Sequence, residues 1–580
     1  MNFKRFAKTN IDDTSIDKRI TILMGIVLLF SIFLSYRIFV KSVLENDKYK
    51  ALADSQHTVK QELNSHRGKI LAMDSSNGEI TELAINIEKF NVNVVPKNVK
   101  DAKDVSEKLS PLLDISENEI FDLIDNDKLY IPPIKKRVDK DLADKIIDLK
   151  LAGVLISAED ARYYPEHTLA SNILGFVNFE GEGKYGLEGY YNAQFKGEEG
   201  TVEALRDTHG RIISSDIAQE VNDGSSLLLT IDINVQYMAE EKIKDAKEKF
   251  SADGASIIIM NPRDGSIIAM ATDKTYDPNN FNEVAKDFGQ SFFNNSIISD
   301  TWEPGSIFKP VVMGAGIDSG KLDYNTIETF SNMTVVQGYE IKTAENKAFG
   351  RQTMTQVLEN SDNVGMVWVG NQMGNDTMYD YLDNFGFGKK TNIDLESESS
   401  GSLLEKKKWR DIHRATISFG QGVAVTPLQM ALSYSVLANG GVLYKPYIVK
   451  KIIKPDGKEI NTEKKIINDK VISQETSEKV KKMLVSVVKN GHAQKAQMDG
   501  YLVGGKTGTA QIPSSSGGYK ENEYNHAFAG FFPVDDPQFV MIVRVDSPKG
   551  FKYAESTAVP TFADMARWLV NYYEILPNTS

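Results

Sequence analysis

An apolar run near the amino end constrains this chain more than any other sequence feature. Seventeen uncharged residues, Ile20 to Tyr36, lie between Arg19 and Arg37, and eleven of them are Ile, Leu, Val or Phe. At ~0.3 to 0.6 kcal/mol each, those eleven favour insertion into a bilayer by roughly 3 to 7 kcal/mol. If Arg37 extends its charge to the interface, residues 20–40 rise ~1.5 Å each and span the ~30 Å hydrocarbon core. The sequence therefore predicts one transmembrane helix over residues 20–40.

A cleaved signal peptide or a buried soluble helix fits the apolar run less well. A signal peptide carries a small-residue cleavage site just after its apolar region, whereas the nearest Ala-x-Ala, Ala51 to Ala53, lies 15 residues beyond Tyr36. A buried helix of a soluble domain normally shows a polar stripe, and this run is apolar all round. We therefore expect the helix to remain as a membrane anchor.

Basic residues flank the apolar run on both sides, so the charge bias is a weak guide to its orientation. They are Lys4, Arg5, Lys8, Lys18 and Arg19 before the run, and Arg37, Lys41, Lys48 and Lys50 after it. Nineteen residues precede the run and 544 follow it. We expect residues 1–19 to form a cytoplasmic tail and the bulk of the chain to lie on the opposite side of the membrane.

Length and composition limit what the rest of the chain can be. A chain of 580 residues is several times the ~100 to 200 residues of one domain, so two or more folded units are expected. The formal charge of −13 argues against a nucleic-acid partner, which requires a basic face. The chain has no cysteine, which excludes disulfides, cysteine-based zinc sites and a thiol nucleophile. Any covalent chemistry therefore falls to Ser, Thr or Lys.

The pattern of the chain changes near residue 220. Before it, short β-rich runs such as residues 91–95 alternate with charged helical stretches such as residues 139–151. After it come a strand candidate, a helical stretch to Phe250, and a hairpin whose strands cover residues 256–260 and 266–272. Antiparallel strands flanked by helices predict an α+β fold. We expect an extracytoplasmic pedestal domain over residues 41–219 and a second domain over residues 220–580.

One serine stands where nucleophilic chemistry is favoured. Neither Gly-x-Ser-x-Gly nor His-Glu-x-x-His occurs, so the signatures of elbow-type hydrolases and zincins are missing. The run from Glu303 to Lys309 instead places Ser306 three residues before the amine of Lys309. Residues three apart share one helix face, so we expect the Lys309 amine to reach the Ser306 hydroxyl. Pro310 is tolerated only near a helix start, so the helix should begin close to Ser306. Free backbone N–H groups and the helix dipole there favour developing negative charge.

Ser-x-x-Lys by itself is a weak signal, because a second copy, Ser15 to Lys18, occurs in the tail and a lone copy usually marks a solvated helix face. Two further motifs strengthen it. Ser361, Asp362 and Asn363 follow 55 residues after Ser306, and Lys506, Thr507, Gly508 and Thr509 begin 145 residues later. Lys-Thr-Gly occurs once in the chain. This trio in this order is typical of the penicillin-recognising serine enzymes.

Lys506 also lies in a segment that matches the sequence pattern of an unrelated motif. Gly500, four residues, then Gly505, Lys506 and Thr507 fit the pattern of a phosphate-binding loop. Such a loop must lead into a helix whose N-terminus holds the phosphates, whereas residues 508–513 are predicted to be extended. We therefore expect no nucleotide site here.

With these motifs the chain resembles the class B penicillin-binding proteins, the membrane-anchored peptidoglycan D,D-transpeptidases of bacterial cell-wall synthesis, over nearly its whole length. Further family signals are Arg67 to Ile70, Asn77, Gly78, Arg162 to Pro165, Gly186 to Glu188, Arg206, Asp207, Gly210, Arg211, Gly420 to Gly422 and Thr426 to Gln429. One departs from the pattern, because Asp74 and Asn77 lie further from Arg67 than the run Arg-Gly-x-Ile-x-Asp-Arg-x-Gly allows.

The resemblance implies an architecture and a chemistry. The architecture is a transmembrane helix, an elongated pedestal of the dimerisation type and a serine β-lactamase-like transpeptidase domain, with no glycosyltransferase module. The chemistry is an acyl-enzyme on Ser306, with Lys309 as the base if burial and a second cation such as Lys506 lower its pKa. Which lysine is the base stays open within the superfamily. Neither a cofactor nor a metal is implied.

The resemblance also assigns roles to the other motif residues. Ser361 is the proton relay towards the leaving amine, and Asn363 holds the substrate backbone. Lys506, Thr507 and Thr509 hold the substrate carboxylate, while the extended strand that includes Gly508 pairs with the peptide as an added strand. The oxyanion is expected at the backbone N–H groups of Ser306 and Thr509.

The implied partners are peptidoglycan stem peptides, one ending in D-Ala-D-Ala and one supplying an amine, and β-lactams that stay bound to the same serine. A multi-span glycan polymerase of the SEDS type and other divisome membrane proteins are expected at the anchor and pedestal. We favour the septal, division (FtsI-like) type over the elongation type, because the chain lacks large insertions and its second motif ends in Asn363. The expected location is the bacterial inner membrane, with a single pass and an extracytoplasmic catalytic domain.

Three further functions use some of the same features. A membrane-bound β-lactamase or β-lactam sensor has the same trio but leaves the ~150-residue pedestal unexplained. A binding scaffold without turnover would not need the intact trio. A D,D-carboxypeptidase uses the same residues with water as acceptor.

Overall fold

The structure is a computed structural model that describes residues 13–50, 58–206, 212–514 and 517–577. Several residues singled out in the sequence lie outside these ranges, namely Lys4, Arg5, Lys8, Ala51, Ala53, Asp207, Gly210 and Arg211. The chain divides into two compact units. Residues 1–65 and 198–222 form the first unit, and residues 66–197 and 223–580 form the second.

The first unit contains one long helix and a small sheet. Within the described residues, the helix over Lys18–Leu44 is long and apolar enough to cross a membrane, with a mean hydropathy of 2.2. Its apolar side chains are exposed around the whole helix, for example Ile22 at 64% and Leu29 at 69%. Water disfavours such a surface and hydrocarbon does not, so this helix agrees with the predicted single-pass membrane anchor. The elements are α1 (Asp13–Phe39), the π-helical turn η1 (Val40–Leu44), and the antiparallel strands β1 (Thr58–Leu63), β8 (Gly200–Arg206) and β9 (Ile212–Gln219).

A seven-stranded sheet forms one layer of the second unit. Its strand order is β19-β18-β10-β2-β3-β4, with β5 also paired to β3. Only β10 and β2 run parallel within this sheet as described. The strands are β2 (Ile70–Met73), β3 (Ile80–Val94), β4 (Lys135–Val138), β5 (Val154–Tyr163), β10 (Ser226–Asp232), β18 (Val449–Ile453) and β19 (Glu459–Asn461). Strands from both sides of residue 220 join this sheet, so it does not separate the two predicted domains. The domain limits at residues 219 and 220 therefore stay a prediction.

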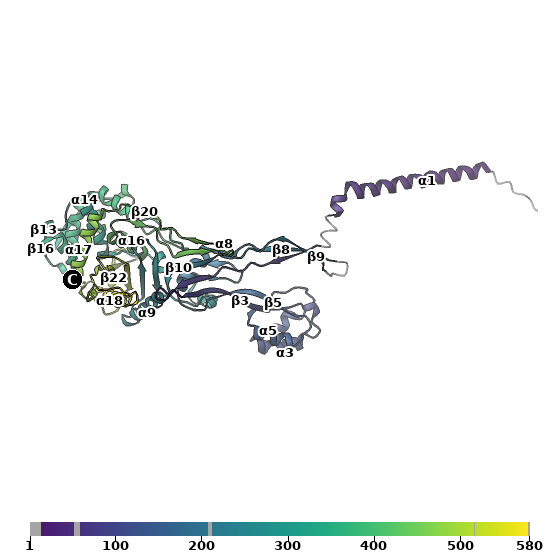
Figure 1. The fold of residues 1–580 in the computed structure, drawn as a ribbon, viewed down its shortest axis with the longest axis horizontal. Helices are drawn as coiled ribbons and strands as arrows, with labels where there is room; N and C mark the ends of the chain where they lie inside the picture. The colour runs from purple at the N-terminus through teal and green to yellow at the C-terminus, as the bar shows by residue number, and fades with distance from the viewer. Residues whose placement is uncertain (1–12, 51–57, 207–211, 515–516, 578–580) are drawn as a thin grey trace, which may run out of the picture. The chain divides into compact units, whose positions relative to one another are not determined.

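Helices α3, α4 and α5 cover the far end of the β3–β5 ladder (Figure 1). Their apolar faces bury Leu109, Ile120 and Ile146 against Val92 of β3. Caps explain where two of these helices begin, since the side chains of Asp101 and Ser116 accept hydrogen bonds from the first-turn N–H groups. The elements here are η2 (Pro96–Asn98), α3 (Ala102–Leu113), α4 (Glu117–Ile124) and α5 (Lys140–Asp148).

A five-stranded antiparallel sheet carries the predicted chemistry. Its order is β12-β11-β23-β22-β21. The strands are β11 (Gly254–Met260), β12 (Ile267–Thr272), β21 (Gly504–Pro513), β22 (Tyr519–Phe532) and β23 (Phe539–Asp546). The hairpin predicted around residue 263 is therefore confirmed, and so is the extended run after Gly508 that excluded a phosphate-binding loop.

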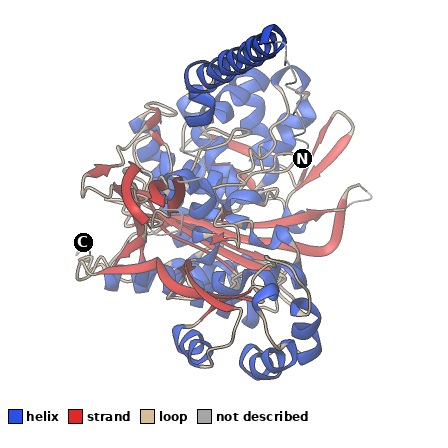
Figure 2. Ribbon diagram, turned by 90° about the vertical axis from the view of Figure 1, so that its right-hand side faces the viewer, coloured by secondary structure: helices blue, strands red, loops and turns tan. Residues whose placement is uncertain are grey.

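Both faces of this sheet are buried. Alternate residues of β11 face opposite ways, so Ile257 and Ile259 pack with α9 (Ile233–Lys249) and α18 (Ala558–Tyr572), while Ile258 and Met260 pack in the other core. This other core contains α12 (Lys309–Asp318) and α16 (Pro427–Ala438). Helices therefore flank the sheet on two sides, as the predicted α+β fold requires. Figure 2 shows the helices of the structure in blue and its strands in red.

The remaining elements surround these two sheets. The helices are α6 (Ser171–Leu174), α7 (Gly186–Tyr190), α8 (Asn192–Lys196), α9 (Ile233–Lys249), α10 (Phe281–Phe288), α11 (Ser296–Ser299), α12 (Lys309–Asp318), α13 (Met354–Glu359), α14 (Asn363–Asn384), α15 (Asp411–Ile417), α16 (Pro427–Ala438), α17 (Gln474–Asn490) and α18 (Ala558–Tyr572). The 3₁₀ turns are η3 (Pro278–Asn280), η4 (Gln290–Phe293), η5 (Gly305–Phe308), η6 (Ala344–Asn346), η7 (Lys406–Lys408), η8 (Gln494–Ala496) and η9 (Ala554–Ser556). The short strands are β6 (Phe176–Val177), β7 (Gly183–Lys184), β13 (Ile327–Phe330), β14 (Met333–Val336), β15 (Tyr339–Lys342), β16 (Gly350–Thr353), β17 (Leu443–Tyr444) and β20 (Ile466–Asn468).

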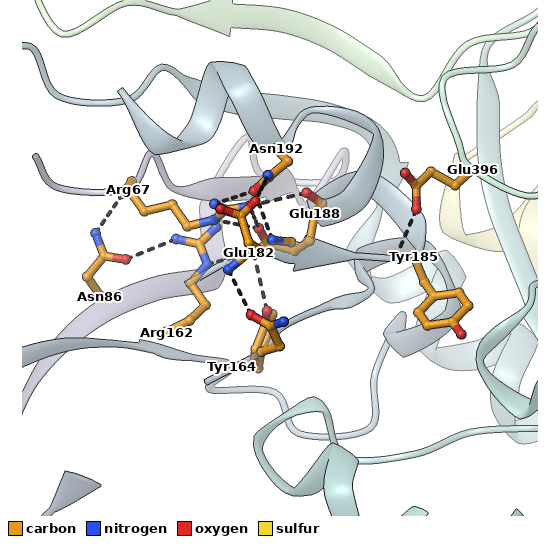
Figure 3. Close-up of polar contacts among 11 residues, drawn as sticks. Arg67, Asn86, Arg162, Tyr164, Glu182, Tyr185, Glu188, Asn192 and Glu396 are labelled. Carbon is orange, nitrogen blue, oxygen red and sulfur yellow. Dashed lines mark hydrogen bonds and ion pairs between the residues drawn. The ribbon is translucent and has the colours of Figure 1, made fainter. Parts of the chain in front are cut away.

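Three of the sequence signals before residue 220 meet in one buried cluster (Figure 3). Glu188 is completely buried and binds Arg67 at 2.6 Å and Arg162 at 2.6 Å. Both guanidinium groups also lie over the ring of Phe195, at 5.2 and 5.6 Å. Burial by itself would raise the pKa of Glu188, but the charges and hydrogen bonds of the two arginines outweigh burial and lower that pKa. Opposite charges in this cluster therefore compensate one another.

Candidate active site

Ser306 lies in the 3₁₀ turn η5, immediately before helix α12. Gly305 takes a left-handed φ of 56°, and its N–H donates to the carbonyl of Gly420 at 3.0 Å. A Cβ atom on Gly420 would lie 2.1 Å from the Gly305 carbonyl oxygen, so only glycine fits there. Tyr434, fully buried, donates its hydroxyl to the carbonyl of Ile307 at 2.8 Å. These contacts fix the turn that presents the serine.

Ser361 connects Ser306 to the amine of Lys309. The Ser361 hydroxyl donates to Ser306 Oγ at 2.9 Å and accepts from Lys309 Nζ at 3.1 Å. Lys309 Nζ also donates to the Ser361 carbonyl at 2.6 Å and to Asn363 Oδ1 at 2.7 Å. Because a hydroxyl both donates and accepts, and its hydrogen rotates, this arrangement provides a path for a proton between Ser306 and Lys309.

The backbone at Ser361 is held in an unusual conformation. Its φ of 52° is left-handed, which a residue with a Cβ rarely adopts. Asp362, fully buried, caps helix α14 by accepting from the N–H groups of Val364 and Gly365, and it also accepts from Gln352 at 2.8 Å. These bonds over-determine the turn and keep Ser361 and Asn363 aimed at Lys309.

Lys309 and Lys506 are two fully buried amines. Burial, and then repulsion from Lys506, lower the pKa of Lys309 well below its usual value, while Asp362 acts in the opposite direction. Burial lowers the pKa of Lys506 to about 7. Among the described residues no carboxylate forms an ion pair with either amine; Lys506 Nζ donates only to the carbonyl and hydroxyl of Thr507, at 3.2 and 3.4 Å. A large fraction of neutral amine is therefore present near neutral pH.

Strand β21 lies against the serine turn. A Cβ atom on Gly508 would lie 3.0 Å from Ile307 Cγ2 and 3.1 Å from the carbonyl oxygen of Pro304, so the missing side chain permits the close approach. β21 ends the strand order of its sheet, so its outer edge has no strand partner in the described part of the chain. The hydroxyl of Thr509 accepts from the N–H of Ala554 at 3.2 Å.

The structure thus brings three remote sequence motifs together. Ser306, Lys309, Ser361 and Asn363 form one hydrogen-bonded group, and β21 places Lys506, Thr507, Gly508 and Thr509 next to it. The roles assigned to these residues stay predictions. Ser15 of the second Ser-x-x-Lys lies in helix α1 of the other unit, where its side chain is outside the described residues.

Two residues near the site had no role in the sequence analysis. Asp362 caps α14, and its position directly before a helical run was a signal that a capping rule can use. Glu303 accepts from the N–H of Gly422 and from the hydroxyl of Tyr519, both at 2.8 Å, and so fixes the serine turn from outside. No local pattern pointed to Glu303, because its partners are distant in sequence.

Two known protein families match parts of this chain. Residues 255–567 match the penicillin binding protein transpeptidase domain, and residues 62–229 match the penicillin-binding protein dimerisation domain. The first match covers more than half of the chain and contains the three motifs of the site.

Curated relatives agree over most of their length. The chain is 32% identical over 565 residues to Stage V sporulation protein D of Bacillus subtilis, covering 96% of this chain and 86% of that protein. It is 29% identical over 568 residues to the peptidoglycan D,D-transpeptidase FtsI of Escherichia coli, covering 97% and 92%. Among solved structures, penicillin-binding protein 3 of Mycobacterium tuberculosis complexed with aztreonam matches with a TM-score of 0.70 and 25% identity, covering 89% of this chain and 98% of that chain.

The fold, the arrangement of the two buried amines beside Ser306 and these matches define the class. The chain belongs to the penicillin-binding proteins and, having a dimerisation domain before its transpeptidase domain, to their class B.

Proposed function

We propose that this protein is a peptidoglycan D,D-transpeptidase that forms an acyl-enzyme on Ser306 and is acylated there by β-lactams. The observation that carries this proposal is the hydrogen-bonded group of Ser306, Ser361 and Lys309, with a second buried amine, Lys506, beside it. A serine hydroxyl needs a base to become nucleophilic, and a lysine serves as one only if its pKa is lowered. The named activity of the relatives supports the same reaction.

Acylation follows from the geometry. Ser306 Oγ attacks the carbonyl carbon of the penultimate D-alanine, and the serine proton passes through the Ser361 hydroxyl to neutral Lys309. Backbone N–H groups of Ser306 and Thr509 hold the oxyanion. The peptide C–N bond then breaks, Lys309 returns the proton through Ser361 to the departing amine, and D-alanine leaves. The product is an ester of Ser306.

Substrate binding uses the second motif and strand β21. Lys506, as the cation, with Thr507 and Thr509 holds the terminal carboxylate, and Asn363 holds a peptide group of the stem. The unpaired edge of β21, with no side chain at Gly508, takes the stem as an additional strand. The acceptor amine attacks the ester carbon, loses its proton to Lys309 and displaces Ser306 Oγ, which regains a proton. The new amide is the cross-link.

Covalent labelling tests the proposal. The full-length protein in detergent micelles is incubated with a fluorescent penicillin, and the modified peptide is identified by mass spectrometry. We expect one label on Ser306 and none in Ser306→Ala, while Ser319→Ala, at the other end of α12, labels like wild type. A label on another residue, or labelling that survives Ser306→Ala, would refute the assignment.

The lifetime of the acyl-enzyme separates a transpeptidase from a β-lactamase. We expect the penicilloyl ester to persist for many minutes and, with a D-Ala-D-Ala donor, product formation to require an added amine. Loss of the label within seconds would identify a β-lactamase instead. Release of D-alanine at the same rate without an amine would identify a carboxypeptidase.

We further propose a place in the cell. The apolar helix anchors the protein in the bacterial inner membrane with its amino end in the cytoplasm and Ser306 outside, and the anchor and pedestal contact a SEDS-type glycan polymerase and other divisome proteins in septal wall synthesis. The similarity to FtsI supports the septal role. A fluorescent fusion should concentrate at division sites, and the purified polymerase should run faster with this protein than without it. Uniform labelling of the lateral wall would indicate an elongation-type enzyme.

A second candidate is wall synthesis during sporulation. It is favoured by the 32% identity to Stage V sporulation protein D, which exceeds the identity to FtsI. Deletion distinguishes the two roles, since a division enzyme is needed in growing cells, whereas a sporulation enzyme is needed only when spores form.

A further inference from the structure

A loop after strand β15 begins beside Asn363 of the site. The side-chain amide of Asn363 donates to the carbonyl of Lys342, the last residue of β15, at 3.0 Å. The next residue, Thr343, is buried, and its hydroxyl donates to the carbonyl of Lys347 at 2.8 Å. Asn332 donates to Asn346 Oδ1 at 3.0 Å and accepts from the N–H of Thr343 at 3.0 Å. The loop over residues 343–347 is therefore fixed to its own hairpin.

Two consecutive residues of this loop are left-handed. Glu345 has a φ of 56° and Asn346 a φ of 58°, a conformation that side chains with a Cβ disfavour. Such strain persists where surrounding contacts over-determine it, and it is concentrated at functional sites. Here the contacts to Thr343 and Asn332 hold the loop. Its backbone thus presents Glu345 in a fixed place rather than leaving it free.

Glu345 contacts a second segment near the site, the one that contains Lys552 and Tyr553. Its carboxylate accepts hydrogen bonds from the hydroxyl of Tyr553 and, at 3.2 Å, from Lys552 Nζ. The hydrogen bond from Tyr553, and then that from Lys552, lower the pKa of Glu345, so it is charged at neutral pH. Loop 343–347 follows β15, whereas Lys552 and Tyr553 follow β23. The contact therefore joins two elements about 200 residues apart.

The segment that carries Tyr553 is attached to strand β21. Ala554, the next residue, donates its N–H to Thr509 Oγ1 at 3.2 Å. On β22, His526 stands opposite Thr509, and its Nδ1 lies 2.8 Å from the hydroxyl of Thr557. A continuous chain of contacts thus runs from Asn363 through Lys342, Glu345, Tyr553 and Ala554 to Thr509. In the proposed function Asn363 holds a peptide group of the stem, and Thr509 holds its terminal carboxylate.

We propose that Glu345 is a positioning residue, which by bridging to Tyr553 and Lys552 holds the Asn363 side and the Thr509 side of the site at the separation that captures a stem peptide. This inference rests on the proposed function and deepens it. Glu345 touches neither Ser306 nor Lys309 among the contacts of the described residues, so it acts on binding rather than on the chemical step. The side chains of Lys552 and Glu345 are 65% and 61% exposed, so the ion pair contributes little energy and its loss should have a modest effect.

The test separates capture from chemistry. Single-turnover acylation by a penicillin, and by a D-Ala-D-Ala thioester or ester donor, is followed over a range of concentrations in wild type and Glu345→Gln. We expect the apparent Kd to rise about 2- to 5-fold with the limiting acylation rate unchanged, a size that exposed charged pairs can support. Glu345→Asp should recover part of the affinity. Tyr553→Phe should weaken capture, and the double variant with Glu345→Gln should lose less than the sum of the two single losses.

Controls exclude a general electrostatic or folding effect. Glu340→Gln removes a carboxylate of the same hairpin, which pairs with Lys342 at 2.9 Å and, within the described residues, makes no contact with Tyr553. It should leave Kd unchanged, and all variants should melt within about 1 °C of wild type because every substituted group except the Tyr553 ring is exposed. High salt should raise the Kd of wild type towards that of Glu345→Gln.

Three results would overturn the inference. They are an unchanged Kd in Glu345→Gln, a fall in the limiting rate with Kd unchanged, and an equal rise of Kd in Glu340→Gln. A wild-type protein that is never acylated would instead refute the proposed function, and this inference with it.

Discussion

Two places in the larger unit bury charged residues completely, and they treat the charges in opposite ways. Around Glu188 one carboxylate meets Arg67 and Arg162 at 2.6 Å, and the pKa of Glu188 is lowered despite its burial. Around Ser306 two lysines, Lys309 and Lys506, lie together with no carboxylate paired to either in the described structure, and both pKa values are lowered.

The difference separates charge that supports the fold from charge that supports chemistry. Opposite charges in a low-dielectric interior compensate their lost hydration, so both partners stay ionised and neither titrates near neutral pH. Like charges cannot compensate each other's lost hydration, so burial lowers the pKa of a lysine and favours its neutral form. A neutral buried amine is costly for folding but useful as a base. The loss of hydration on burial therefore leads to a compensated ion cluster in one place and to a reactive amine in the other.

Removing the reactive amine should have the largest effect. In Lys309→Met we expect acylation of Ser306 by penicillin to fall by about 10³-fold, within the 10² to 10⁴ range typical of a general base. Lys479→Met, at a partly exposed lysine paired with Asp323, is the control and should acylate normally. Stopped-flow or gel-based labelling rates measure the change. An effect below 10-fold would transfer the role of base to Lys506.

Breaking the compensated cluster should cost stability rather than rate. Glu188→Gln leaves two buried guanidinium groups without their counter-charge, so the free energy of unfolding should fall by about 3 to 5 kcal/mol. Glu82→Gln breaks the exposed pair with Lys69 and should change it by less than ~1 kcal/mol. Thermal and urea unfolding of the full-length protein measure both. Equal effects in the two variants would contradict the comparison.

Removing the second amine should stabilise the protein. The pKa of Lys506 is about 7 in the folded protein against an ordinary 10.5, so the unfolded chain binds more protons between those values and stability rises with pH across that window. Lys506→Met removes the free-energy cost of burying this amine. We expect the free energy of unfolding to rise by about 1 to 4 kcal/mol at pH 7, and this gain should shrink towards pH 10.5. Unfolding curves at several pH values test it. A loss of stability, or a gain that does not depend on pH, would be the contrary result.

The pH dependence of acylation gives the smallest and finest test. Because the pKa of Lys309 is lowered, the labelling rate should hold from pH 10 down towards neutrality and decline only on the acid side. Part of that lowering comes from Lys506, so in Lys506→Met the decline should move to higher pH. Second-order labelling rates across pH locate the decline. A shift to lower pH in the variant would show that Lys506 does not repel the charge on Lys309.

Local sequence patterns predicted much of this molecule. The apolar run, the hairpin at β11 and β12, and the extended run through Lys506 were confirmed as elements, because each depends on periodicity over a few neighbouring residues. The order of the three motifs also named the side chains that the structure brings together. The position of Ser361 between Ser306 and Lys309 was not predictable, since spacing on a helix face pointed to direct contact between nucleophile and amine.

The contacts made by Glu303 and Glu345 could not be predicted for a similar reason. Each connects segments more than 100 residues apart, and no local pattern records which distant surface a side chain will meet. The pairing of β10 with β2 likewise joins strands from both sides of the pattern change near residue 220.

The amino-acid sequence by itself determined which groups are available for chemistry, a hydroxyl, two amines and an amide with no thiol, and which stretches are helix, strand or membrane span. Only the tertiary structure decided what those groups can do. A lysine is an ordinary cation until distant segments exclude water from it and place another cation nearby, and that exclusion of water exists only after the chain has folded.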